Sequence, residues 1–253
     1  MDKNAQVLEL GKVSSYPSQL LEVIKKEIDV FRAWELDFPS RSASSYDRSM
    51  ERLCEALQPY AVRGWHCTKL TRSEIEDVRV NGLRVLNYKF LEARIGSLVK
   101  ESIVDVNLAR LLLSGSRARD SNRAGMAWFC FYEPRFAGEE GIRRLLSNWG
   151  GEALYWAFEG HSEVGPILRN IGIPAVVEAR VPINVLRSAD RIAVAAVRVY
   201  LKAMGERVLE SAKAEHYSIF DIPASFLEAI HVYPESGFRA ITSCDGWRLP
   251  LSA

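Results

Sequence analysis

The segment from residue 62 to residue 82 constrains the fold most strongly, because its ends are marked by local chemistry. Residues 62–70 have the apolar texture of a short strand, and Thr71-Arg72-Ser73-Glu74 follows as a capping box. In such a box the threonine and the glutamate satisfy free backbone N–H groups at the start of a helix. Asn81-Gly82 supplies the residues that end helices. The segment therefore predicts a strand, a turn and a helix.

Apolar spacing predicts further short elements on both sides of this unit. Helices are expected at residues 17–36, 46–58, 90–113, 139–147, 164–170 and 192–212. Strands are expected at residues 126–132, 152–158, 174–183, 216–221 and 228–233. Short strands that alternate with short helices, and end in strands, indicate an α+β fold.

Composition excludes several classes of protein. Basic and acidic residues number 33 and 32, so overall charge favours neither nucleic acid nor an anionic membrane. Neither GxGxxG nor GxxxxGK[ST] occurs, which removes the commonest nucleotide-binding loops. The four cysteines form no CxxC pair, so no metal site is expected. No apolar run is long enough to cross a membrane, and reduced cysteines favour a cytoplasmic location.

Three motifs, in order along the chain, resemble those of ADP-ribosyltransferases of the His-Tyr-Glu type, the group of poly-ADP-ribose polymerases and diphtheria-like toxins. The first is His66-Cys67-Thr68 followed by a helix and Gly82-Leu83. The second is Gly151-Glu152-Ala153-Leu154-Tyr155-Trp156-Ala157, interpreted as a strand. The third begins at Glu215 and runs through Ile222-Pro223 to the final strand.

The resemblance implies a split mixed β-sheet with flanking helices over residues 61–235. Residues 1–60 then form a helical N-terminal region, and residues 236–253 form a C-terminal tail. The stretch at about 90–149 is long for the family and is interpreted as an insertion. The implied reaction is mono-ADP-ribosyl transfer from NAD to a protein or nucleic-acid acceptor, with release of nicotinamide.

The resemblance also assigns roles to residues. His66 would bond a ribose hydroxyl, and Thr68 would support the same strand. Tyr155 would stack on the nicotinamide ring, and Glu215 would stabilise the cation-like ribose. The catalytic set is thus His66, Tyr155 and Glu215, and the nucleotide-binding set is His66, Cys67, Thr68, Tyr155 and Trp156.

Alternatives to these assignments remain open. Glu178, inside an apolar strand, and Glu152 are rival carboxylates for Glu215. The stacking ring could instead come from an aromatic strand that holds Phe129, Phe131 and Tyr132. Each aromatic could equally be a core residue, and Glu215 could be a solvated glutamate.

Two further sequence features bear on the acceptor and on the reaction. Residue 213 is lysine, so the Gln-x-Glu or paired-acid motif of arginine-directed transferases is absent. Arg117, Arg119 and Arg123 could contact phosphate, although such polar stretches are usually solvated loops. Two further hypotheses follow: an enzyme similar to RNA 2′-phosphotransferases, and a non-enzymatic binding protein with a vestigial cleft.

Overall fold

The computed structural model describes residues 5–251, and these fold into eleven α-helices and one six-stranded sheet. The predicted α+β class is therefore confirmed. Two compact units divide the chain. The first unit comprises residues 1–64, 128–132 and 179–217, and the second comprises residues 65–127, 133–178 and 218–253. N-terminal residues thus share a unit with two segments from much later in the chain.

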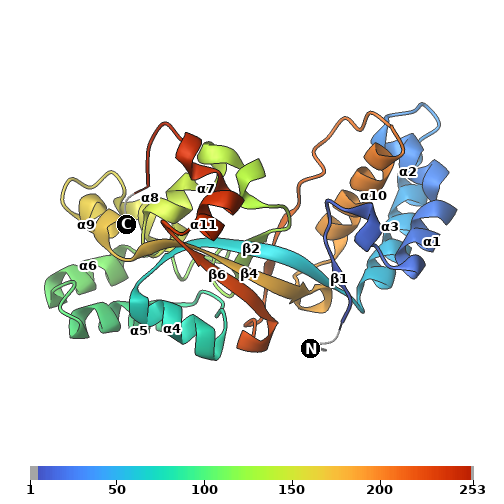
Figure 1. Cartoon of the computed structure of the whole chain (residues 1–253). Helices are drawn as coiled ribbons and strands as arrows, with labels where there is room; N and C mark the ends of the chain where they lie inside the picture. Colours follow the sequence, from blue (N-terminus) through green and yellow to red (C-terminus); the bar gives the residue numbers. More distant parts are fainter. Residues whose placement is uncertain (1–4, 252–253) are drawn as a thin grey trace. The chain divides into compact units, whose positions relative to one another are not determined.

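Four helices form the helical part of the first unit, and α10 packs directly on α2 and α3 (Figure 1). Their bounds are α1 (Ser18–Lys26), α2 (Ile28–Glu35), α3 (Ala43–Leu57) and α10 (Asp190–Ala203). Leu20, Ile24 and Phe31 are fully buried at helical spacing. The single helix predicted at 17–36 is interrupted at Glu27, which ends α1 and precedes α2.

The strands follow the order β5-β3-β2-β4-β6, and β1 pairs in parallel with the start of β2. Their bounds are β1 (Val7–Leu8), β2 (Ala61–Leu70), β3 (Ala127–Cys130), β4 (Ile173–Pro182), β5 (Glu215–Ser218) and β6 (Leu227–Val232). The two long strands β2 and β4 each contribute residues to both units. The segment interpreted as an insertion supplies β3, an interior strand of this order.

The helix that the capping box predicts is present in the second unit. Helix α4 (Arg72–Asn81) begins after Thr71, whose hydroxyl accepts from the Glu74 N–H while the Glu74 carboxylate accepts from the Thr71 N–H. Gly82 ends the helix with φ of 83°, a conformation that costs glycine little. Ile75 and Val78 of α4 pack against Leu70 and against β4 and β6.

Trp149 is fully buried in a core built by four further helices of the second unit: α5 (Tyr88–Lys100), α6 (Val106–Gly115), α8 (Glu152–Phe158) and α9 (Val164–Asn170). The remaining helices of this unit are α7 (Gly138–Ser147) and α11 (Ser236–Thr242). Residues 90–113 were predicted as one helix, and the structure divides this stretch between α5 and α6. The helix predicted at 192–212 ends at Ala203.

The strand predicted at 152–158 is wrong, because these residues form α8. Gly150 and Gly151, both at positive φ, turn the chain immediately before it. A run of seven apolar and aromatic residues fits a strand or a buried helix equally well by periodicity alone. Leu154 and Phe158, four residues apart, fill the core around Trp149 and favour the helix.

Candidate functional site

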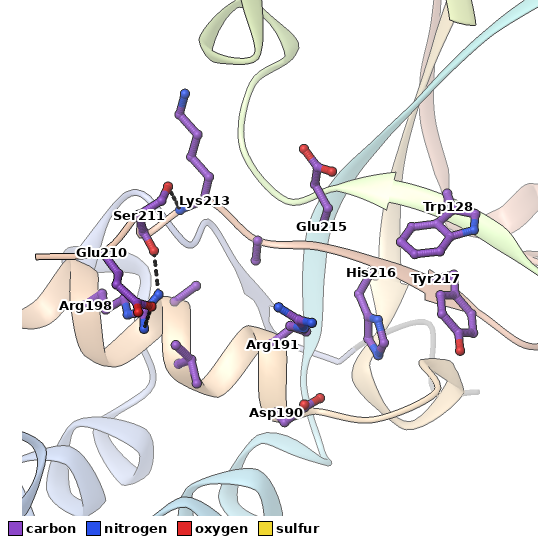
Figure 2. A pocket seen from close by; sticks show the side chains of 13 residues that line it. Trp128, Asp190, Arg191, Arg198, Glu210, Ser211, Lys213, Glu215, His216 and Tyr217 are labelled. Carbon is purple, nitrogen blue, oxygen red and sulfur yellow. Dashed lines mark hydrogen bonds and ion pairs between the residues drawn. The ribbon is translucent and has the colours of Figure 1, made fainter. Parts of the chain in front are cut away.

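A groove of about 770 Å³ lies within the first unit, between α10 and the chain from residue 210 to residue 217 (Figure 2). We call it the groove. The side chains that matter most for its chemistry are Trp128, Arg191, Lys213, Glu215, His216 and Tyr217. Its volume falls in the range typical of small-molecule sites, roughly 300–1,000 Å³.

Strands β3 and β5 position the groove residues through the alternation of side chains along a strand. On β3, Trp128 is 45% exposed whereas its neighbour Phe129 is buried. On β5, Glu215 is exposed and His216 is buried. The rings of Trp128 and Tyr217 meet with centroids 4.8 Å apart and planes tilted by 50°. The groove thus presents an aromatic pair beside a carboxylate.

The Glu215 carboxylate has a defined orientation although it is exposed. The hydroxyl of Tyr132, two residues after the end of β3, donates a hydrogen bond to Glu215 Oε1. Lys213 Nζ lies 5.6 Å from the centroid of the Tyr132 ring, within the range of a cation–π contact. The predicted catalytic glutamate is therefore a held carboxylate with cationic and aromatic neighbours.

His216 follows Glu215 on β5, and its side chain stabilises the start of α10. Its Nε2 atom accepts from the Ser188 backbone N–H at 3.2 Å, which leaves the proton of the neutral ring on Nδ1. Burial lowers the pKa of His216, and this effect outweighs the nearby charge of Asp190. The Ser188 hydroxyl donates to Asp190. Because Asp190 bonds the serine and not the histidine, these residues do not form a nucleophilic triad.

Arg198 connects the groove to the N-terminal helices. Its guanidinium donates to Glu210 Oε2 at 2.5 Å and to Glu35 Oε2 at 2.6 Å. Glu35 is buried and also accepts from the Tyr46 hydroxyl at 2.8 Å. The charges of Arg198 and Glu210 are consequently engaged with each other, and the groove keeps Arg191, Lys213, Asp190 and Glu215 as its other charged residues.

The first predicted motif lies on β2 in the second unit. His66 and Thr68 are half-buried and share one face of the strand, whereas Cys67 is buried on the opposite face. Because the Cys67 side chain faces the core, only the backbone of this residue could contact a ligand. Of the three residues, Cys67 is therefore the least accessible to a nucleotide. The nucleotide-binding roles of these residues stay predictions.

The strand setting predicted for Tyr155 is overturned. Tyr155 lies on α8, is 3% exposed, and carries the Arg144 guanidinium 4.5 Å from its ring centroid. Its hydroxyl donates to Glu152 Oε1 at 3.0 Å. Trp156 does not face the opposite side, as it would on a strand: it is 48% exposed and also contacts Arg144. In this conformation Tyr155 has the surroundings of a packing residue.

The residues considered as alternatives to Glu215 and Tyr155 differ in their contacts and in their burial. Glu178 bonds His231 Nε2 at 2.9 Å, and Glu152 accepts from Tyr155. Phe129 and Phe131 are buried, which leaves Tyr132 as the candidate ring that contacts a predicted carboxylate. Burial alternates along residues 128–132, and this alternation could have identified Tyr132 from the sequence. Trp128 and Tyr217 were not singled out from the sequence.

The arginine-rich loop is used in contacts within the second unit. The Arg119 guanidinium lies 3.8 Å from the centroid of the Tyr88 ring. Arg123 lies 3.7 Å from Asp120 and 3.6 Å from Glu152, and its side chain is largely buried. These contacts occupy two of the three arginines that could have bound phosphate.

Residues 5–251 hold no group of three or more histidine, cysteine, aspartate or glutamate side chains placed to bind a metal ion. Over the same residues, every helix is too short or too polar to span a membrane. Comparison with models of known families, with characterised proteins and with solved structures found no match. The function of the groove is therefore argued from its own chemistry.

Proposed function

We propose that this protein is an NAD-dependent mono-ADP-ribosyltransferase whose reaction takes place in the groove. One observation carries the proposal: Glu215, selected from a sequence motif, lies in a groove of the right size for a nucleotide, with Tyr132 bonded to its carboxylate. The order β5-β3-β2-β4-β6, with a short parallel strand at β2, is compatible with the split mixed sheet that the resemblance implies.

The chemistry follows from the charges. Cleavage of the bond between nicotinamide and ribose leaves positive charge on the sugar. A carboxylate held at that point stabilises the charge more in the transition state than in the ground state. Glu215 has this position in the proposal, and the Tyr132 hydroxyl fixes the direction of its oxygen atoms. Such pre-orientation avoids reorganisation during the reaction.

The Tyr132 ring replaces Tyr155 as the surface for nicotinamide. Tyr132 is half-buried and lies next to Glu215, whereas the Tyr155 ring is buried beside Arg144. Arg191, which lines the groove at the start of α10, would face the pyrophosphate. A guanidinium suits this group because it binds phosphate oxygens in pairs.

The test is nicotinamide release from NAD by the purified protein and by Glu215→Gln. We expect the variant to lose more than a hundredfold in rate, since it removes the charge and keeps the shape. Glu210→Gln is the matched control, because Glu210 lines the same groove but is paired with Arg198. Release that survives in Glu215→Gln would refute the role of Glu215.

His66 is tested separately, because it lies in the second unit. If it binds the adenosine ribose, His66→Ala raises the KM for NAD by about tenfold, the cost of one or two hydrogen bonds. Thr68→Val, which alters the same strand face, should have a smaller effect. An unchanged KM in His66→Ala would remove this residue from the binding set.

Arg191 in the groove favours a second candidate, an RNA 2′-phosphotransferase, because that reaction needs basic residues around a phosphate. It predicts that phosphate transfer survives Glu215→Gln and fails in Arg191→Ala. A binding protein without activity would instead show neither reaction. Absence of any thermal shift with millimolar NAD would favour that outcome, because a ligand of the native state raises its stability.

A further inference from the structure

Glu215 is carried into the groove by a connection that has no secondary structure of its own. Residues 204–214, between α10 and β5, form neither helix nor strand. Their conformation therefore depends on individual contacts, because a regular ladder of backbone hydrogen bonds does not run through them. A carboxylate in a catalytic site has to be held within about 0.5 Å of its working position. The contacts that fix this connection thus determine where the Glu215 carboxylate lies.

Arg198, on α10, fixes the connection at Ser211 (Figure 2). Its Nη1 atom donates to the Ser211 carbonyl at 2.8 Å. The Ser211 hydroxyl accepts from the Lys213 N–H at 3.1 Å, and the Ala214 carbonyl accepts from the Phe131 N–H at 2.9 Å. The chain is therefore held at three successive points before β5 begins, and the first of them depends on Arg198.

The N-terminal helices hold Arg198 from the other side. Its Nε atom donates to Glu35 Oε2 at 2.6 Å, and the other oxygen of Glu35 accepts from the Tyr46 hydroxyl at 2.8 Å. The Tyr46 ring stacks on Trp34, with centroids 4.6 Å apart. Because the guanidinium is planar and rigid, fixing Nε at Glu35 also fixes the direction of Nη1. The position of α2 is thereby transmitted to the connection that leads to β5.

Stability alone does not explain why this ion pair is buried. The Glu35 side chain is 2% exposed and that of Arg198 is 16% exposed. Removing two such charges from water costs about as much as their attraction returns, so the pair adds little net stability. Glu210, the other carboxylate on Arg198, is 72% exposed, and its pairing is correspondingly weak. Glutamine at position 210 would leave the bonds to Glu35 and Ser211 in place.

We infer that Arg198 is a positioning residue for Glu215. Held by Glu35, it fixes the Ser211 carbonyl and so sets the direction in which the chain enters β5. The effect on catalysis rests on the proposed function, whereas the fixing of the chain is independent of it. Since Glu215 is proposed to act on the transition state, its displacement should lower kcat and leave the KM for NAD unchanged.

Nicotinamide release by Arg198→Lys and Glu35→Gln tests the role in catalysis. Lysine keeps the positive charge beside Glu35 but has one nitrogen in place of three donors. Glutamine keeps the size of Glu35 and removes the charge that holds the guanidinium. In each variant we expect kcat to fall about tenfold and the KM for NAD to stay within about twofold. Thermal unfolding identifies the variants that are folded, and either variant alone is sufficient for the test.

Glu206→Gln is the matched control. Glu206 lies 2.9 Å from Arg32, so this second carboxylate–arginine pair also joins α2 to the connection. It ends five residues before Ser211 and has no part in the bonds that precede β5. Its kcat should equal that of the wild type, whereas the double variant Glu35→Gln/Arg198→Lys should lose no more than the worse single variant, because both act through one contact.

Hydrogen exchange tests the same contact without NAD. The peptide that spans residues 211–217 should exchange faster in Arg198→Lys and in Glu35→Gln than in the wild type, because the chain opens more readily there. In Glu206→Gln its exchange should be unchanged. Mass spectrometry of the digested protein measures this difference.

A fall in kcat with unchanged KM and faster exchange, both absent from Glu206→Gln, supports the inference. Wild-type kcat in Arg198→Lys and Glu35→Gln, an equal loss in Glu206→Gln, or a raised KM with unchanged kcat overturns it. Failure of the wild type to release nicotinamide overturns the proposed function instead. Exchange then still decides whether Arg198 fixes the chain, and unchanged exchange in both variants shows that it does not.

Discussion

Two of the tyrosine–glutamate pairs in this protein, one in each unit, differ in burial. In the second unit the Tyr155 hydroxyl donates to Glu152, and the ring is buried beneath Arg144. In the first unit the Tyr132 hydroxyl donates to Glu215, an exposed residue of β5. The hydrogen bond is the same, but only the second carboxylate lines a groove. Access, and not residue type, distinguishes a site from a packing contact.

The same contrast holds for charge. The second unit largely buries Glu74 against Arg94 and the Trp149 indole, whose N–H donates to Glu74 Oε2 at 2.9 Å. The first unit exposes Arg191 and Glu215 in the groove. Buried charges are expected to govern stability, and exposed charges to govern binding. The following variants test this division.

The largest effect is expected for Glu74→Gln. Burial alone would raise the pKa of Glu74, but the Arg94 charge and the hydrogen bonds to the carboxylate outweigh it and lower the pKa. Glutamine can still accept the Thr71 and Trp149 hydrogen bonds, so the loss comes from leaving the largely buried Arg94 without its anion. Breaking such a pair costs about 3–5 kcal/mol, measured by denaturant unfolding at pH 7.

The lowered pKa of Glu74 determines how the stability lost in Glu74→Gln changes with pH. Because the folded-state pKa of Glu74 is lowered, its stabilisation is present above the unfolded pKa and is lost as pH falls through the folded pKa. The difference between Glu74→Gln and wild type should therefore shrink in acid. Glu76→Gln, on the exposed side of α4, should change stability by less than about 0.5 kcal/mol. Equal losses in both variants would contradict the division.

Tyr155→Ala should lower the free energy of unfolding by about 3 kcal/mol, in line with the removal of a buried aromatic ring. Its exposed neighbour provides the control: Trp156→Ala should cost far less. Thermal unfolding of both variants distinguishes packing from ligand stacking. A Tyr155→Ala variant with unchanged stability but a raised KM for NAD would restore the role first predicted for this residue.

Lys69→Met should raise the free energy of unfolding by about 1 kcal/mol near pH 7. Lys69 is fully buried and donates to the Arg169 carbonyl, and desolvation by burial lowers its pKa to about 8. Between that value and the ordinary lysine pKa, the unfolded chain binds more protons, so the stability that Lys69 contributes rises with pH. The variant should lack this rise. A Lys69→Met variant that unfolds more easily would show that the bond to Arg169 outweighs desolvation.

Tyr132→Phe should change the free energy of unfolding by less than about 1 kcal/mol, because it removes one exposed hydrogen bond. Its effect should appear in activity instead. If the hydroxyl orients Glu215, kcat for nicotinamide release falls about tenfold while the KM for NAD stays within twofold. A fall in affinity with unchanged kcat would assign the hydroxyl to ligand binding and not to positioning.

The sequence predicted the elements whose ends carry specific chemistry. The capping box at Thr71 and the stop at Gly82 located α4 closely, because those residues satisfy backbone groups that are local in the chain. The prediction for residues 152–158 was wrong for the opposite reason. Their apolar run is compatible with two periodicities, and packing around Trp149 favours the helix. Signals that depend on neighbouring residues therefore predict an element correctly. The secondary structure of an ambiguous apolar run depends instead on contacts with residues that are distant in sequence.

The candidate site was predictable only in part. Glu215 was selected from the motif that precedes Ile222-Pro223, and the structure places it in the groove. Trp128 and Tyr217 lie 89 positions apart in sequence, and their contact depends on the pairing of β3 with β5, which no short pattern encodes. Tyr132 was only one of three candidate rings until its hydroxyl was found on Glu215.

The contact of Arg198 with Glu35 has a practical consequence for anyone who trims this protein. A fragment that begins at residue 61 would lose Glu35 and Tyr46, and Arg198 would keep Glu210 as its one carboxylate partner. Arg198 on α10 would then lose the contact with Glu35 that holds it, although every residue that lines the groove would still be present. The N-terminal helices therefore belong in any fragment that is made to study the groove.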